Sequence, residues 1–192
     1  MKNTLMILLL FTFICINAYP QSYAGNGKII LNSGEELVGK VAIELYHPDE
    51  VAIGLSNREI KNFNTRAVKE FYIEDKHYFT IKIPVIGNTN TFAYLISKEG
   101  YKIRLFRYEQ SDLSKSISTE IYVLFEGEQK AYTLDDFRVH PFSKVSKFVQ
   151  SCPELAKKIA DKQEGYTLPN SASTDEFIEL YKKVAEEYQN CN

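Results

Sequence analysis

The stretch Thr91–Tyr108, with the sequence TFAYLISKEGYKIRLFRY, indicates the fold of this chain most directly. Apolar and aromatic side chains alternate with other residues along Phe92–Ile96 and again along Tyr101–Leu105. Such alternation is typical of a strand with one buried face. Lys98–Gly100 lies between the two segments and supplies a glycine where a short loop requires a positive φ. The stretch therefore predicts a β-hairpin.

Segments with the same alternation lie on both sides of this hairpin. We expect further strands at 27–31, 37–45, 51–55, 60–63, 67–73, 77–83, 120–126 and 129–134. Residues typical of turns separate them, for example at 32–34 and 126–128. Roughly eight to ten short strands without helices between them predict an antiparallel β-rich body at 25–134, folded as a sandwich or a partly open barrel.

The apolar period changes after Leu134, and the rest of the chain is predicted to be helical. Pro153 suits the first turn of a helix, and Ser151 is expected to cap that helix. Ser173–Glu176 is a second candidate for a capping box. It begins a helix whose apolar face is formed by Phe177, Tyr181, Val184 and Tyr188. We therefore expect an α+β protein in which a helical subdomain at 135–192 packs on the sheet.

The N-terminal segment 1–24 is typical of an export signal. Lys2 precedes an apolar run over Leu5–Ile16, which is shorter than the about 20 residues that span a bilayer comfortably. Cleavage fits after Ala18 or after Ala24, and the sequence does not separate the two sites. The alternative is an uncleaved anchor, which would be the chain's contact with the membrane. The segment predicts an exported protein, either periplasmic or extracellular.

The cysteines are interpreted in the light of export. Cys15 leaves with the signal segment, and Cys152 and Cys191 remain. Two cysteines in an oxidising compartment predict a disulfide, with two free buried thiols as the alternative. The bond would close a loop of about 40 residues and stabilise the fold by on the order of 4 kcal/mol, because it restricts the unfolded chain.

The overall composition is that of a globular protein. The chain of 192 residues is 44% hydrophobic and 25% charged, which argues against disorder. Its 13 tyrosines and 12 phenylalanines favour strands. A formal net charge of −2, without a basic stripe, argues against a nucleic-acid partner.

Three motifs occur in order along the chain. They are Gly27-Lys28-Ile29 with Gly34-Glu35 and Val38-Gly39-Lys40-Val41, the hairpin Phe92…Leu95…Glu99-Gly100…Ile103…Leu105-Phe106, and the tail Cys152-Pro153-x-Leu155…Lys158-Ile159…Tyr181…Cys191. Together they resemble uncharacterised exported β-rich proteins of Gram-negative, Bacteroidetes-like bacteria. The resemblance implies export and a β-rich architecture, and it implies no activity.

The sequence contains no motif of a familiar catalytic or metal site, such as Gly-x-Ser-x-Gly, HExxH, a phosphate-binding glycine loop or an EF-hand loop. We accordingly predict no catalytic residue, no metal and no cofactor. An enzyme would need a site that only the fold assembles, with His77, His140 or Asp136 as participants. Asp136 with its neighbour Asp135 is more simply interpreted as part of a turn or helix cap.

One predicted strand face combines cations and aromatic rings. It is formed by Lys102, Arg104, Phe106 and Tyr108. Arg104, Phe106 and Tyr108 are the candidate ligand-binding residues, because rings and guanidinium groups bind glycans by stacking and hydrogen bonding. The alternatives are a solvated face and a surface covered by the helices. We predict a non-enzymatic binding or structural module of the cell envelope, with an envelope protein or a glycan as its partner. The alternative is an envelope hydrolase.

Overall fold

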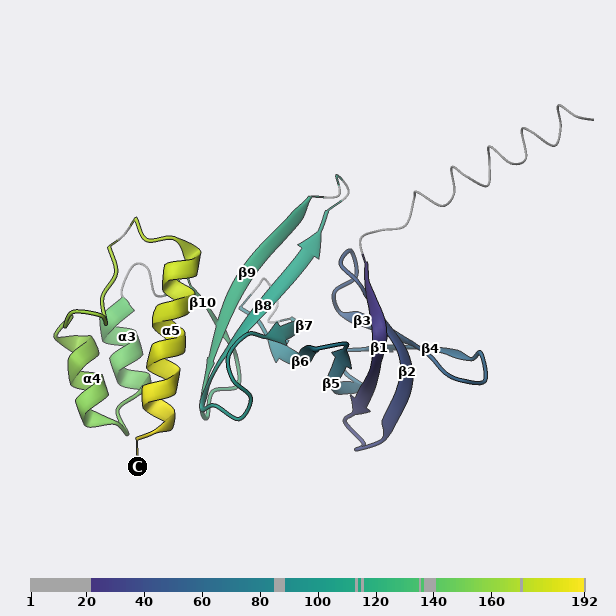
Figure 1. Ribbon diagram of the computed structural model, residues 1–192, viewed down its shortest axis with the longest axis horizontal. Helices are drawn as coiled ribbons and strands as arrows, with labels where there is room; N and C mark the ends of the chain where they lie inside the picture. Colours follow the sequence, from purple (N-terminus) through teal and green to yellow (C-terminus); the bar gives the residue numbers. More distant parts are fainter. Residues whose placement is uncertain are drawn as a thin grey trace, which may run out of the picture.

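The computed structural model describes residues 22–84, 89–112, 114, 116–134, 136, 141–169 and 171–191. In these residues the chain forms a ten-stranded sheet followed by helices (Figure 1). The strands are β1 Ser22–Leu31, β2 Glu36–Glu44, β3 Glu50–Gly54, β4 Ile60–Asn64, β5 Val68–Ile73, β6 Lys76–Lys82, β7 Asn90–Leu95, β8 Ile103–Ser111, β9 Ile117–Phe125 and β10 Tyr132–Thr133. The helices are α3 Pro141–Phe148, α4 Pro153–Ala160 and α5 Thr174–Gln189.

The strands lie in the order β10-β9-β8-β7-β6-β5-β1-β2-β3-β4, and all neighbours are antiparallel. The sheet is open, with β10 and β4 at its two edges. This confirms the predicted α+β class, with a partly open antiparallel body and C-terminal helices. Figure 1 shows the helices together beside β8 and β9, with β1–β4 at the opposite end of the molecule.

The central hairpin is formed by β7 and β8, with Tyr94 opposite Arg107 and Leu95 opposite Phe106. Gly100 has a φ of 78°, as the loop requires. The loop is longer than predicted and spans 96–102. β8 and β9 also extend beyond the predicted segments, which end at Tyr108 and begin at residue 120. Their polar side chains resemble a loop in sequence, but the backbone pairs as far as Ser111 and Ile117.

Three hydrophobic clusters use both faces of this sheet. The N-terminal core contains Ile29, Val41, Ile43, Val51, Ile53, Val68, Phe71, Ile73, Tyr78 and Phe92. The central core contains Ile81, Ile83, Ala93, Phe106, Tyr108, Tyr122, Leu124 and Ala131. Successive residues of a strand point to opposite faces, so β6 places Tyr78 in the first cluster and Ile81 in the second. The N-terminal core and the central core therefore lie on opposite faces of the curled sheet.

Two backbone hydrogen bonds outside the strand ladders connect distant parts of the curled sheet. Ser111 N donates to Leu45 O at 2.9 Å, which brings the end of β8 to the β2–β3 turn. Ala131 N donates to Lys82 O at 2.9 Å, which brings the segment before β10 to the end of β6. β1 itself approaches β5 closely, because a Cβ atom at Gly27 would lie 1.9 Å from Tyr72 O.

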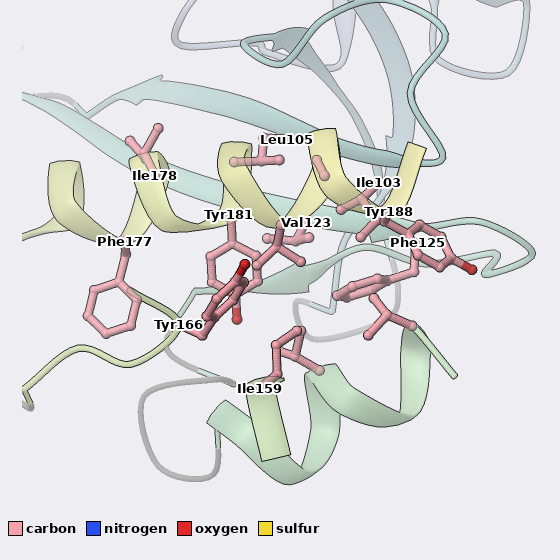
Figure 2. Packing of buried hydrophobic residues seen from close by; sticks show 14 of the residues in the cluster. Ile103, Leu105, Val123, Phe125, Ile159, Tyr166, Phe177, Ile178, Tyr181 and Tyr188 are labelled. Carbon is pink, nitrogen blue, oxygen red and sulfur yellow. The ribbon is translucent and has the colours of Figure 1, made fainter. Parts of the chain in front are cut away.

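The third cluster, the helical core, joins the helices to the face of β8 and β9 that lies opposite the central core (Figure 2). Tyr181 and Val184 of α5 contribute to the same cluster as Leu105 of β8 and Val123 of β9. The predicted apolar stripe of α5 is thus buried. A disulfide joins Cys152, the residue before α4, to Cys191, the second residue after α5, and their Cα atoms lie 5.7 Å apart.

The two predicted caps have different outcomes. The capping box of α5 is confirmed, because Ser173 Oγ accepts from Glu176 N and Glu176 Oε2 accepts from Ser173 N. The prediction for α4 is wrong, because Cys152 occupies its N-cap position and makes no side-chain cap. Ser151 instead lies 2.7 Å from the Tyr188 hydroxyl, since the end of α5 packs beside it. No helix among the described residues is long and apolar enough to cross a membrane.

Candidate functional site

The candidate face of β8 is largely covered. Arg104, Phe106 and Tyr108 share one face, as predicted, but Phe106 is fully buried and Tyr108 is only 8% exposed. Both rings belong to the central core. Arg104 is partly exposed, and its Cζ lies 5.7 Å from the centre of the Phe79 ring and 5.6 Å from that of Phe106. Of these three residues, only Arg104 offers substantial surface to a ligand.

His77 lies near Arg104, on the same face of the sheet. Its ring stacks between Tyr72 and Phe79, at centre distances of 3.9 and 4.0 Å. Its Nε2 lies 3.0 Å from Glu70 Oε2, and its Nδ1 lies 3.3 Å from a Glu99 oxygen without hydrogen-bond geometry. Groups of the protein itself therefore occupy both ring faces and face both nitrogens.

The other residues considered for a fold-assembled enzyme do not join His77 in the part of the chain that the structure describes. Asp136 accepts hydrogen bonds from the backbone N and the hydroxyl of Thr133, at 2.9 and 3.0 Å, and its own N donates to Thr133 Oγ1 at 3.1 Å, which is the reciprocal pattern of a helix cap. His140 lies outside the described residues. Within those residues no group of three or more histidine, cysteine or acidic side chains could hold a metal ion.

A groove of about 430 Å³ lies between the β7–β8 loop and α5. It is lined by Ile96, Ser97, Lys98, Tyr101, Glu179, Lys182, Lys183 and Glu186. Its charged residues pair with one another, since Lys98 Nζ lies 3.3 Å from Glu186 Oε1 and Lys182 Nζ lies 2.8 Å from Glu179 Oε1. The groove therefore offers a ligand mostly groups that are already paired.

The most distinctive polar constellation lies on the opposite face of β6 from His77. It comprises Tyr23, Lys76, Tyr78, Tyr94, Arg107 and Glu109, and we call it the tyrosine–arginine cluster. Strand register assembles it, because Tyr78 lies opposite Tyr94, and Tyr94 lies opposite Arg107. Lys76 and Glu109 are each two residues further along a strand and so share this face.

The contacts within the tyrosine–arginine cluster connect the first strand to the eighth. The hydroxyl of Tyr23 donates to Glu109 Oε2 at 2.8 Å. Lys76 Nζ lies 4.0 Å from the centre of the Tyr23 ring and 4.8 Å from that of Tyr94, which places the ammonium near two ring faces. Arg107 Cζ lies 5.9 Å from the centre of the Tyr94 ring. The cluster thus has aromatic walls, two cations and one carboxylate.

Two buried atoms of the cluster have no hydrogen-bond partner among the described residues. They are the hydroxyl oxygen of Tyr78 and Nε of Arg107. Tyr78 is only 4% exposed, and its ring stacks on Phe71 at 4.6 Å with an interplanar angle of 5°, which fixes where the hydroxyl points. An unpaired buried polar group costs about 1–3 kcal/mol, so such groups are uncommon. Two of them, on the strands that flank Tyr94, mark this cluster as the candidate site.

The electrostatics of the cluster favour hydrogen-bond donation. Burial, with help from the Glu109 carboxylate, raises the pKa of Tyr23 to about 12 and also raises the pKa of Tyr78 and Tyr94. All three phenols are therefore protonated at neutral pH. Among the described residues neither Lys76 nor Arg107 forms an ion pair with a carboxylate. Two positive charges face one negative charge.

The sequence reasoning missed this cluster. Alternation places Phe92 and Tyr94 on one face, but it does not say which strands lie beside them. Tyr23 lies within the segment predicted to be an export signal, so the sequence gives no reason to place it in a binding site. The cluster can donate hydrogen bonds, neutralise an anion and present ring faces, which is the chemistry of ligand recognition.

No protein-family model, curated protein or solved structure significantly matches the chain.

Proposed function

We propose that this protein is an exported, non-enzymatic binding module of the cell envelope, and that it binds a small polar ligand at the tyrosine–arginine cluster. The observation that carries the proposal is the pair of buried, unpartnered donors on Tyr78 and Arg107. A core that did not bind a ligand would be more stable with apolar groups at these positions. Sites that break such rules at a cost in stability are typically functional.

The groups of the cluster suit binding better than proton transfer. The Glu109 carboxylate accepts a hydrogen bond from Tyr23, and burial keeps the phenols protonated at neutral pH. Tyr78, Tyr94 and Arg107 are held by adjacent strands, which fix their spacing more firmly than loops would. Five of the six side chains are partly exposed, so a ligand can reach the cluster from solvent.

Export is supported by the character of segment 1–24 and by the Cys152–Cys191 disulfide, since disulfides persist in oxidising compartments. The structure also bears on the choice of cleavage site. Cleavage after Ala24 would remove Tyr23, which pairs with Ile43 in the sheet and donates to Glu109. Cleavage after Ala18 would retain these contacts, and we propose this as the processing site.

Thermal shift of the mature protein against sugars, sugar acids, nucleotides, metals, lipids and peptides tests the function. A ligand at 100 times its dissociation constant adds about 2.7 kcal/mol, which is a shift of roughly 5–10 °C at this size. The test variant is Tyr78→Phe. The matched control is Tyr108→Phe, since Tyr108 is also buried but its hydroxyl donates to Gln110 at 2.9 Å.

The proposal expects a compound that shifts the wild type and Tyr108→Phe by similar amounts and shifts Tyr78→Phe much less. Equal shifts in all three proteins would place the ligand outside the cluster and contradict the proposal. A shift lost only in Tyr108→Phe would instead point to the β8 face predicted from the sequence.

A further inference from the structure

We infer that the ligand of the tyrosine–arginine cluster is an acidic sugar unit, with one carboxylate on a hydroxylated ring. This inference rests on the proposed function and specifies its ligand. Each feature of such a ligand matches a group in the cluster that the protein leaves available: a pair of donors, an excess of positive charge, a carboxylate acceptor and a ring face.

The carboxylate is inferred from the two unpartnered donors. Tyr78 and Arg107 flank Tyr94 on the neighbouring strands, one on each side. Their free atoms are an O–H and an N–H, and an ionised carboxylate has two acceptor oxygens and no donor. A carboxylate in the cluster can therefore accept from these donors, as in the strong charge-assisted bonds that guanidinium groups form with carboxylates.

The charge balance selects a monoanion. Lys76 and Arg107 supply two positive charges, and Glu109 supplies one negative charge. A ligand with a single carboxylate brings the cluster to neutrality, whereas a zwitterionic amino acid would leave the excess positive charge in place. A phosphate dianion would leave the cluster with a net charge of −1 and would bring two negative charges near Glu109, which repels them.

The sugar ring is inferred from the remaining groups. Glu109 Oε2 accepts from Tyr23, and an ionised carboxylate has acceptor capacity left for ligand hydroxyls. A sugar ring would stack on Tyr23 or Tyr94 in place of the Lys76 ammonium, which lies 4.0 and 4.8 Å from the centres of these two rings. Because the Tyr78 hydroxyl is buried, we expect a side chain of the cluster to change rotamer when a ligand binds, which is a common adjustment.

Isothermal titration calorimetry of the mature protein tests the inference with three probes: D-galacturonate, D-glucuronate and D-mannuronate. Each is compared with its neutral hexose, and inorganic phosphate is titrated separately. We expect at least one uronate to bind at least tenfold more tightly than its hexose and more tightly than phosphate. We expect Tyr78→Phe and Arg107→Lys each to weaken it at least fivefold, and Tyr108→Phe to change affinity less than twofold.

The outcomes separate this inference from the proposed function. Equal affinity for a hexose and its uronate, both weakened by Tyr78→Phe, would overturn the acidic ligand but leave a binding cluster. Phosphate binding that depends on Arg107, without uronate binding, would do the same in favour of a simple anion site. Uronate binding unaffected by both variants would place it elsewhere and overturn the inference and the assignment of the site together. Failure of all three uronates would overturn the inference.

Discussion

Replacing Tyr78 by phenylalanine is expected to stabilise the unliganded protein, although the residue is 4% exposed and lies in a core. The ring would keep its stacking on Phe71 at 4.6 Å, and the change removes a hydroxyl that has no partner among the described residues. Relief of that unpaired group is worth about 1–3 kcal/mol. For a domain of this size each kcal/mol raises Tm by roughly 2–4 °C.

Urea unfolding of the mature proteins measures this change as a higher midpoint at an unchanged slope. Tyr108→Phe is the matched control, because it removes a hydroxyl that donates to Gln110 and should cost about 0.5–1.5 kcal/mol. The two substitutions remove the same atom and are expected to have opposite signs. A loss of about 1 kcal/mol or more in Tyr78→Phe would contradict this expectation, because it would show that the hydroxyl is paired in the free protein.

Three further predictions concern the helical subdomain and the N-terminus. Reduction of the Cys152–Cys191 disulfide should lower stability by on the order of 4 kcal/mol, measured by unfolding with and without reductant; unchanged stability would contradict the chain-entropy argument. Ser173→Ala should cost about 1 kcal/mol, because it removes the cap of α5. Hydrogen bonds from Ser173 lower the pKa of Glu176 below its ordinary 4.5. The extra stability of the wild type over Ser173→Ala should therefore be present above pH 4.5 and shrink as the pH falls below it. A stability difference that does not depend on pH would argue against a role of the Glu176 carboxylate in the cap. The intact mass of the exported protein should correspond to cleavage after Ala18. A mass that corresponds to cleavage after Ala24 would contradict this, because the mature protein would then lack part of β1 and of the proposed site.

Much of the fold follows from local patterns in the sequence. Alternation along 37–45, 67–73 and 77–83 indicates strands, and the structure has β2, β5 and β6 there, with ends that differ by one residue. The capping box at Ser173 is a local signal as well, and it begins α5 as predicted. These features depend on residues within a few positions of one another. The extension of β8 to Ser111 does not, because the backbone there is held by pairing with β9.

The site depends on contacts that the sequence pattern cannot supply. The shared face of Arg104, Phe106 and Tyr108 was predictable, but its burial follows from the curl that brings Ile81 and Ala131 into the same core. The tyrosine–arginine cluster depends on register across three strands and on one long-range hydrogen bond from Tyr23 to Glu109, 86 residues apart. The role of Ser151 is not local either, because its partner Tyr188 lies 37 residues away in the sequence.

If the proposed site is correct, the free donors of Tyr78 and Arg107 receive the acidic group of the ligand. A crystal structure of the mature protein grown with the tightest-binding uronate measures this directly. We expect carboxylate oxygens at hydrogen-bond distance, about 2.5–3.2 Å, from Tyr78 Oη and Arg107 Nε. Ordered water on both atoms, with the uronate elsewhere or disordered, would contradict it.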